Sequence, residues 1–189
     1  GMVLLDLQKA FDCVDLGFIL KKLKGMGIKS TDWFRSYLTG RRQCTVVGNA
    51  NSGFLDVTCG VPQGSILGPT LFLCYINDMA ASLRCRVSLY ADDSTLIASG
   101  ESGEELADFL SGELANCREW MNDNRLSLHL GKTECMLFGS RRRLKSVGNF
   151  SVAWGNVTVS RVSSVKYENL SGNEQATACI KRVAARLAF

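Results

Sequence analysis

Aspartates at or near the ends of strand-like apolar segments constrain the fold of this chain more than any other feature. The first residues form a short, nearly continuous apolar run with Asp6 near its end, as expected of a buried strand that reaches a cleft. Two later strands, predicted over residues 86–90 and 95–98, are joined by a turn that contains Asp92 and Asp93. If these strands are neighbours in one sheet, three carboxylates that are far apart in the sequence meet.

A cluster of carboxylates has a specific chemical meaning. Like charges at short distance repel, so the cluster persists only with a cation between the groups or with protonation. Hard oxygen ligands suit Mg²⁺, and two such ions about 3.5–4 Å apart can hold the attacking and leaving oxygens of a phosphoryl transfer. An Asp-Asp pair is also a common turn sequence, because Asp favours turns. From the residues alone, a metal site and an ordinary turn both stay open.

The remaining pattern predicts an α+β fold with an antiparallel sheet packed on helices. The clearest helix covers residues 104–121, where apolar residues recur at steps of three and four. Further helices are predicted over residues 16–24, 30–40, 66–79 and 176–189. Further strands are predicted over residues 2–7, 43–47, 54–59, 135–138, 152–154 and 157–159.

Composition narrows the class of protein. With 189 residues, of which 46% are hydrophobic and 21% charged, the chain is one domain able to bury a core, and disorder is excluded. A net charge of +4 permits a polyanionic partner. Eight cysteines without a CxxC motif, beside a single histidine, argue against zinc and for buried thiols in a reducing compartment, the cytoplasm or nucleus. The uncharged stretch 57–77 is broken by Pro62 and Pro69, so no membrane span is expected.

Three motifs in order resemble one enzyme family. Tyr90-Ala91-Asp92-Asp93 resembles the YxDD signature of reverse transcriptases. Residues 5–12 (LDLQKAFD) resemble the first catalytic motif of that family, and residues 60–69 (GVPQGSILGP) resemble its second. Together with Ile76-Asn77-Asp78 and Lys132-Thr133, these motifs resemble the reverse transcriptases of the non-LTR, LINE-type retrotransposon branch, which includes jockey-like mobile elements.

The resemblance implies a right-hand polymerase palm that acts as an RNA-directed DNA polymerase. The palm core is expected over residues 1–140, and residues 141–189 are expected to be an incomplete C-terminal segment with a primer-grip remnant. Asp6, Asp92 and Asp93 are then the catalytic metal ligands for two Mg²⁺ ions, with Mn²⁺ as a possible substitute. The implied partners are an RNA template, a DNA primer and deoxynucleoside triphosphates, and the oligomeric state stays open.

The family also implies roles for several substrate-binding residues. The backbone carbonyl of Leu7 is a further candidate ligand, and Tyr90 belongs to the substrate-binding set. Phe11 is placed where the family has a bulky ring beneath the incoming sugar, which would exclude a 2′-hydroxyl; the alternative is a core phenylalanine. Gln63 and Gly64, expected at the start of a helix, are assigned to the nascent base pair and template; the alternative is a loop that caps a core helix.

Lys132 resembles the lysine that the family brings near the pyrophosphate leaving group, although a surface lysine fits as well and His129 replaces the family's preceding asparagine. Two basic stretches, Arg41-Arg42 and residues 141–145, are candidates for phosphate contacts or are solvated loops. The aromatic residues Trp33, Phe34 and Tyr37 have the spacing of a core-facing helix, with base stacking as the alternative.

The resemblance is incomplete at both ends. The chain starts at the first catalytic motif, so fingers strands and a thumb are expected to be incomplete. Residues 165–172 are similar to the primer grip but are interrupted by Glu168-Asn169. The alternative to an active polymerase core is therefore a truncated, inactive retroelement remnant that at most binds RNA. A group II intron reverse transcriptase is disfavoured by Leu67-Gly68-Pro69.

Overall fold

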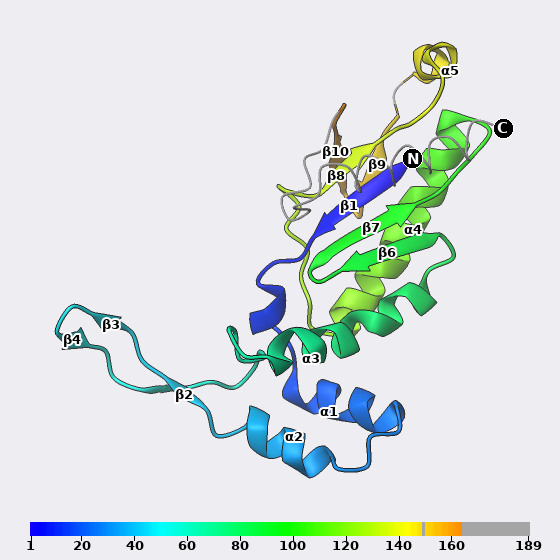
Figure 1. The fold of residues 1–189 in the computed structure, drawn as a ribbon. Helices are drawn as coiled ribbons and strands as arrows, with labels where there is room; N and C mark the ends of the chain where they lie inside the picture. The colour runs from blue at the N-terminus through cyan, green and yellow to red at the C-terminus, as the bar shows by residue number, and fades with distance from the viewer. Residues whose placement is uncertain (149, 164–189) are drawn as a thin grey trace.

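A mostly antiparallel six-stranded sheet organises the molecule, in the order β6-β7-β1-β8-β10-β9. Figure 1 shows this computed structural model, which describes residues 1–148 and 150–163. Only β8 and β10 pair in parallel among these strands. The strands of the sheet are β1 (Met2–Asp6), β6 (Arg86–Tyr90), β7 (Asp93–Ile97), β8 (Glu134–Met136), β9 (Val152–Trp154) and β10 (Val157–Arg161).

In the described part of the chain, five α-helices lie between strands of the sheet in sequence. The α-helices are α1 (Leu16–Gly25), α2 (Thr31–Leu38), α3 (Leu67–Ile76), α4 (Gly103–Asp123) and α5 (Arg141–Ser146). Of these, α1, α2 and α3 come between β1 and β6, α4 comes between β7 and β8, and α5 comes between β8 and β9. Two 3₁₀ helices are η1 (Ala10–Asp12) and η2 (Asn77–Ser82). The expected α+β class is confirmed as a mixed fold with a mostly antiparallel sheet, and the strands predicted over 152–154 and 157–159 form a hairpin at its edge.

The helix α4 covers one face of the sheet, as Figure 1 shows. Ser102 caps its start, because the Ser102 side chain accepts a hydrogen bond from the Glu105 backbone N–H at 3.1 Å. The residues that recur along one side of α4 are buried, in agreement with the predicted periodicity. In the sheet, Val3, Leu5 and Leu96 belong to the same core. Side chains alternate along a strand, so Met2, Leu4 and Asp6 of β1 project to the opposite face, where Asp6 and its partner Asp93 are the acidic pair at one end.

The two strands predicted over residues 43–47 and 54–59 are only partly formed. This segment makes four two-residue strands, which pair as β2 with β5 and β3 with β4, and all of their residues are exposed. These strands are β2 (Arg42–Gln43), β3 (Val46–Val47), β4 (Ala50–Asn51) and β5 (Leu55–Asp56). Figure 1 shows residues 42–56, here called the arm, reaching away from the sheet. A β-prone sequence forms a regular strand only when a neighbouring surface covers it.

Two local expectations were wrong. The basic run at residues 141–145 is not a loop but makes up all of α5 except its last residue, because Arg, Leu and Lys favour helices and the Ser140 side chain accepts a hydrogen bond from the Arg143 N–H at 3.3 Å. Trp33 does not face the core: 56% of its surface is exposed, while Phe34 and Tyr37 pack partly against the core.

Cysteine burial is uneven. Of the seven cysteines that the structure describes, only Cys117 and Cys135 are buried, and all seven are free thiols. Burial raises the pKa of Cys117 to about 12, and burial, with nearby Glu113, raises that of Cys85 to about 11, so both thiols stay protonated at neutral pH. The expectation of buried cysteines therefore holds for two positions only.

Within residues 1–148 and 150–163, no helix is long and apolar enough to span a membrane. The helix predicted over 176–189 and the primer-grip segment at 165–172 lie outside the described residues.

Candidate active site

The register of the sheet brings Asp6, from the LDLQKAFD motif, beside Asp93, from the YADD motif. In the antiparallel pair of β1 and β7, Asp6 lies directly opposite Asp93, although Asp93 comes 87 positions later in the sequence. Residues directly opposite each other in such a pair project to the same face of the sheet. The face in question is the one away from Val3 and Leu5, so both aspartates leave the apolar face and lie where solvent reaches them.

The turn between β6 and β7 presents the second aspartate. Tyr90 pairs with Asp93 across the hairpin, and Ala91 and Asp92 form the two-residue connection. Ala91 has a φ of 52°, in the left-handed region that side chains seldom adopt. Asp92 is exposed, as is 59% of Tyr90. Tyr90, Asp93 and Asp6 are therefore cross-strand neighbours on β6, β7 and β1, and Asp92 lies beside them at the tip of the hairpin. The three aspartates, Asp6, Asp92 and Asp93, are called the carboxylate row below.

Lys132 approaches the same row from the other side of β1. Its Nζ lies 3.9 Å from Oδ2 of Asp6, in a pair whose lysine is 66% and aspartate 36% exposed. The Lys132 loop is held to β1 by the His129 N–H, which donates to the Asp6 carbonyl at 2.8 Å. The buried Thr133 side chain reinforces this contact, because its Oγ1 donates to the His129 carbonyl and accepts from the Asp6 N–H at 3.5 Å.

Leu7 follows β1 and is held in place by the segment between α4 and β8. It forms an isolated antiparallel bridge with Leu128 and is buried. The next N–H, that of Gln8, donates to the Ser127 carbonyl at 2.8 Å. The backbone that leaves Asp6 is thus fixed on both sides, which limits where the carbonyl of Leu7 can point.

Phe11 lies in η1 and contacts the core. Its ring is 4.5 Å from that of Phe72, with the ring planes tilted by 31°, and it is only partly buried. Both interpretations of Phe11 therefore keep a structural basis: one part of the ring packs on α3, and the rest remains accessible to a ligand.

The GVPQGS segment docks onto the segment that contains Phe11. Val61 N–H donates to the Phe11 carbonyl at 2.9 Å, and Gln63 Nε2 donates to Oδ1 of Asp12 at 2.7 Å. Gly60 is required here: its φ is +80°, and a Cβ would lie 2.8 Å from the backbone of Asp12. The first and second motifs are therefore parts of one surface.

Gln63 and Gly64 do not lie at the start of a helix as expected. They form the exposed turn before it, and α3 begins at Leu67. The hydroxyl of Ser65, which donates to the Pro62 carbonyl and accepts from the Gly68 N–H at 3.0 Å, closes this turn and delays the helix. Gly64 has a φ of +76°, a conformation that favours glycine.

Two residues of this surface were missed at the level of sequence. Asp12 is the last residue of the first motif, and only the fold reveals it as the partner of Gln63. The buried Thr133 follows Lys132 directly, so the motif itself was the available signal. Neither residue has a local pattern that indicates its partner.

The donor chemistry of the row suits a hard divalent cation. Asp6 and Asp93 are carboxylates on one face, and Asp92 adjoins them. Within residues 1–148 and 150–163, however, no three acidic, histidine or cysteine side chains are close enough to form a closed metal cluster. The oxygen ligands are thus of the type that a divalent cation prefers, and the Lys132 Nζ lies 3.9 Å from Oδ2 of Asp6.

Comparison with known proteins identifies the family. Residues 1–170 match the model of the reverse transcriptase (RNA-dependent DNA polymerase) family. The chain is 29% identical to an RNA-directed DNA polymerase from the mobile element jockey of Drosophila funebris, over 73% of this chain and 16% of that protein. It is 30% identical to a probable RNA-directed DNA polymerase from the transposon X-element of Drosophila melanogaster, over 74% and 16%.

A third relative, a putative 115 kDa protein in the type-1 retrotransposable element R1DM of Drosophila melanogaster, is 31% identical over 75% of this chain and 14% of that protein. The chain thus spans about one-sixth of the curated relatives that it matches. The similarity to non-LTR elements that the motifs indicated is confirmed. On the family match over most of its length, the chain belongs to the reverse transcriptase (RNA-dependent DNA polymerase) family.

Proposed function

We propose that the chain is the palm of an RNA-directed DNA polymerase, with the Asp6, Asp92 and Asp93 row as its catalytic centre. The observation that carries this proposal is the direct opposition of Asp6 and Asp93 on one face of the sheet, in a chain of this family. Mg²⁺, or Mn²⁺ in its place, is the ion that these oxygens would hold, and it supplies activation of the primer hydroxyl and charge neutralisation at the triphosphate.

The protein's own residues position the substrates. The partners are an RNA template, a DNA primer and deoxynucleoside triphosphates. Lys132, already beside Asp6, carries a positive charge toward the departing pyrophosphate and can donate a proton there. The exposed part of Phe11 blocks a 2′-hydroxyl on the incoming sugar, and the buried part anchors the ring on Phe72.

The docked GVPQGS turn and the hairpin tip complete the surface. Gln63, held by Asp12, and Gly64, which leaves room beside the backbone, face the nascent base pair. Tyr90 lies at the exposed end of the row and contacts the primer end, while the Leu7 carbonyl is a further oxygen for the cation.

Metal binding tests this centre without depending on turnover. We expect the 189-residue chain to bind Mn²⁺, measured by electron paramagnetic resonance, and Asp92→Asn or Asp6→Asn to weaken that binding by about tenfold or more, since each removes one charged ligand. Asp108→Asn, which changes an exposed aspartate on α4, is the matched control and is expected to leave the affinity unchanged.

Primer extension tests the reaction. With an RNA template, a DNA primer and Mg²⁺, Asp92→Asn is expected to lower extension by at least about 100-fold relative to wild type, the scale of losing a transition-state contact. Asp108→Asn is expected to match wild type. Equal extension by wild type and Asp92→Asn, or Mn²⁺ affinity that is insensitive to both site variants, would contradict the proposal.

A further inference from the structure

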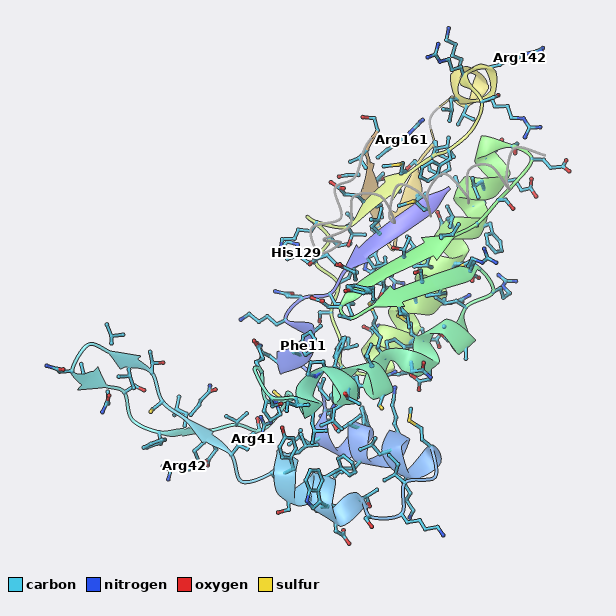
Figure 2. All side chains as sticks on the ribbon, in the orientation of Figure 1. Phe11, Arg41, Arg42, His129, Arg142 and Arg161 are labelled. Carbon is cyan, nitrogen blue, oxygen red and sulfur yellow. The ribbon has the colours of Figure 1, made fainter. Side chains whose placement is uncertain are left out.

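Positive charge is concentrated in one part of the chain, away from the carboxylate row. Residues 21–44, which cover the second half of α1, all of α2 and the start of the arm, contain seven Lys or Arg and one Asp. This segment therefore carries a formal charge of +6, whereas the whole chain carries +4. Figure 2 shows Arg41 and Arg42 where the chain passes from α2 into the arm. Such a concentration of positive charge is typical of a surface that binds a polyanion.

Several of these cations already hold the fold together. Lys22 donates to the Tyr75 carbonyl and pairs with Asp78, both at 2.7 Å. Arg41 donates to three backbone carbonyls, those of Leu38, Cys59 and Gly60. Arg42 pairs with Asp56 at 3.5 Å. These contacts fix the basic surface but leave less of its charge for a ligand.

The exposed lysines of α1 and its exit supply the remaining charge. Lys24 and Lys29 are exposed, and Lys21 is exposed beside the Phe18 ring, 5.5 Å from its centroid. A single acidic residue, Asp32, lies on this stretch, and it approaches Arg35 at a marginal 4.0 Å with its side chain fully exposed. The accessible charge of the surface is thus strongly positive.

Three aromatic residues of α2 lie within the same basic stretch of the chain. Trp33 is stacked on Tyr37, one helical turn later, with ring centroids 5.6 Å apart and planes at 4°. Phe34 meets Trp33 edge-on at 5.1 Å. Leu38 is fully buried and Phe34 and Tyr37 pack partly on the core, so α2 is anchored by these residues while Trp33 remains 56% exposed. One face of the Trp33 ring is therefore covered by Tyr37, and we call the face turned away from Tyr37 its outer face.

Rigid exposed aromatic rings among lysines are the means by which proteins hold single strands. Bases stack on the rings, the cations follow the phosphates, and a duplex offers no free base face to such a ring. The helix α5 has a comparable density of charge at residues 141–145 but carries no aromatic residue. Charge alone favours any polyanion, whereas the combination on α2 favours single-stranded nucleic acid.

We propose that Trp33 on α2, with Lys24 and Lys29, forms a binding surface for single-stranded nucleic acid. One base stacks on the outer face of Trp33, and the two lysines contact neighbouring phosphates. The surface depends on the proposed function only for the identity of the strand, which is then the unpaired template. Binding itself involves neither the carboxylate row nor a divalent ion.

Binding of a fluorescein-labelled oligouridylate of about 12 nucleotides, followed by fluorescence anisotropy without divalent ions, tests the surface. Trp33→Ala is expected to raise the Kd by at least about fivefold, the lower end for loss of one stacked base, and Trp33→Phe is expected to retain most of the affinity. Phe109→Ala, which removes a 36% exposed ring on α4, is the matched control and is expected to bind like wild type.

The contribution of charge is measured separately. Lys24→Gln with Lys29→Gln is expected to lower the slope of log K against log salt by about 1.4, because each single-strand phosphate contact contributes about 0.7. An abasic oligomer of equal length is expected to bind wild type and Trp33→Ala alike. Thermal unfolding of each variant checks that the exposed substitutions leave the fold intact.

The two proposals fail in different ways. Asp92→Asn is expected to bind the oligouridylate with unchanged affinity, so loss of primer extension says nothing against the α2 surface. If Trp33→Ala binds the oligouridylate as tightly as Phe109→Ala, or loses as much affinity for the abasic oligomer as for the oligouridylate, the stacking platform is refuted. The surface of Trp33 would then be available to a polypeptide instead.

Discussion

The sheet under α4 and the arm are built from similar residues and reach opposite outcomes. Both contain valine and leucine in segments that favour strands, yet Val3 and Leu96 are fully buried while Val47 and Leu55 are 73% and 71% exposed. The sheet has a helix to bury its apolar face, and among the described residues the arm packs mainly on itself. Coverage by a second element, more than strand propensity, decides which segment becomes a regular sheet.

Truncating one leucine in each region should give the largest difference. Leu96→Ala in β7 is expected to lower the free energy of unfolding by about 2–5 kcal/mol, because it opens a cavity in a closed core. Leu55→Ala in β5 is expected to change it by less than about 0.5 kcal/mol. Urea unfolding of both variants measures the contrast, and equal losses would show that the arm is folded as firmly as the sheet.

The two regions also differ in their ion pairs. The Glu113 carboxylate of α4 is fully buried, pairs with Arg84 and accepts the N–H groups of Arg84 and Cys85, whereas both partners of Arg42–Asp56 in the arm are largely exposed. Glu113→Gln is therefore expected to lower the free energy of unfolding by about 1–3 kcal/mol. Asp56→Asn is expected to cost at most about 1 kcal/mol.

The pH dependence of stability separates these ion pairs further. Burial alone raises the pKa of Glu113, but hydrogen bonds from the Cys85 and Arg84 N–H groups and the Arg84 guanidinium outweigh it, so the net pKa lies below 4.5. Because the folded pKa is depressed, the stabilisation is complete above about pH 4.5 and disappears as the pH falls through the folded value. Urea unfolding at several acidic pH values should show a shallower loss in Glu113→Gln, and an unchanged slope would contradict this account.

Helix caps give the smallest expected difference. Ser102 caps α4 through its hydroxyl, while Ser30 precedes α2 without a side-chain capping bond. Ser102→Ala is expected to lower the free energy of unfolding by about 1 kcal/mol, and Ser30→Ala by a few tenths at most, roughly. Thermal unfolding resolves the pair. A larger loss in Ser30→Ala would show that α2 depends on its cap as much as α4 does.

Sequence patterns predicted the sheet under α4 better than they predicted the arm. The period of α4 and the paired strands on either side of Asp92-Asp93 follow from where apolar residues recur. Glu113 was missed, although a charged residue three positions after Leu110 lies within the apolar stripe and is itself a signal for a buried partner.

The arm, α5 and the site were predicted less completely, for reasons that are physical. Strand propensity in the arm says nothing about whether a covering surface exists, and a run of arginines is judged by charge although its helix propensity is high. The proximity of Lys132 to Asp6 and of Gln63 to Asp12 depends on long-range packing, so only the family motifs pointed to these residues.

Because Asp6 lies directly opposite Asp93, the face to which Asp6 projects depends on the exact number of residues in β1. One extra residue inserted after Leu5 would leave Val3 and Leu5 in register with β7 and rotate the aspartate toward the helix-covered side. A copy with that insertion keeps its hydrophobic interior while its acidic row is broken. In a lineage that accumulates small insertions and deletions, chemistry at this edge is therefore lost before the ability to fold.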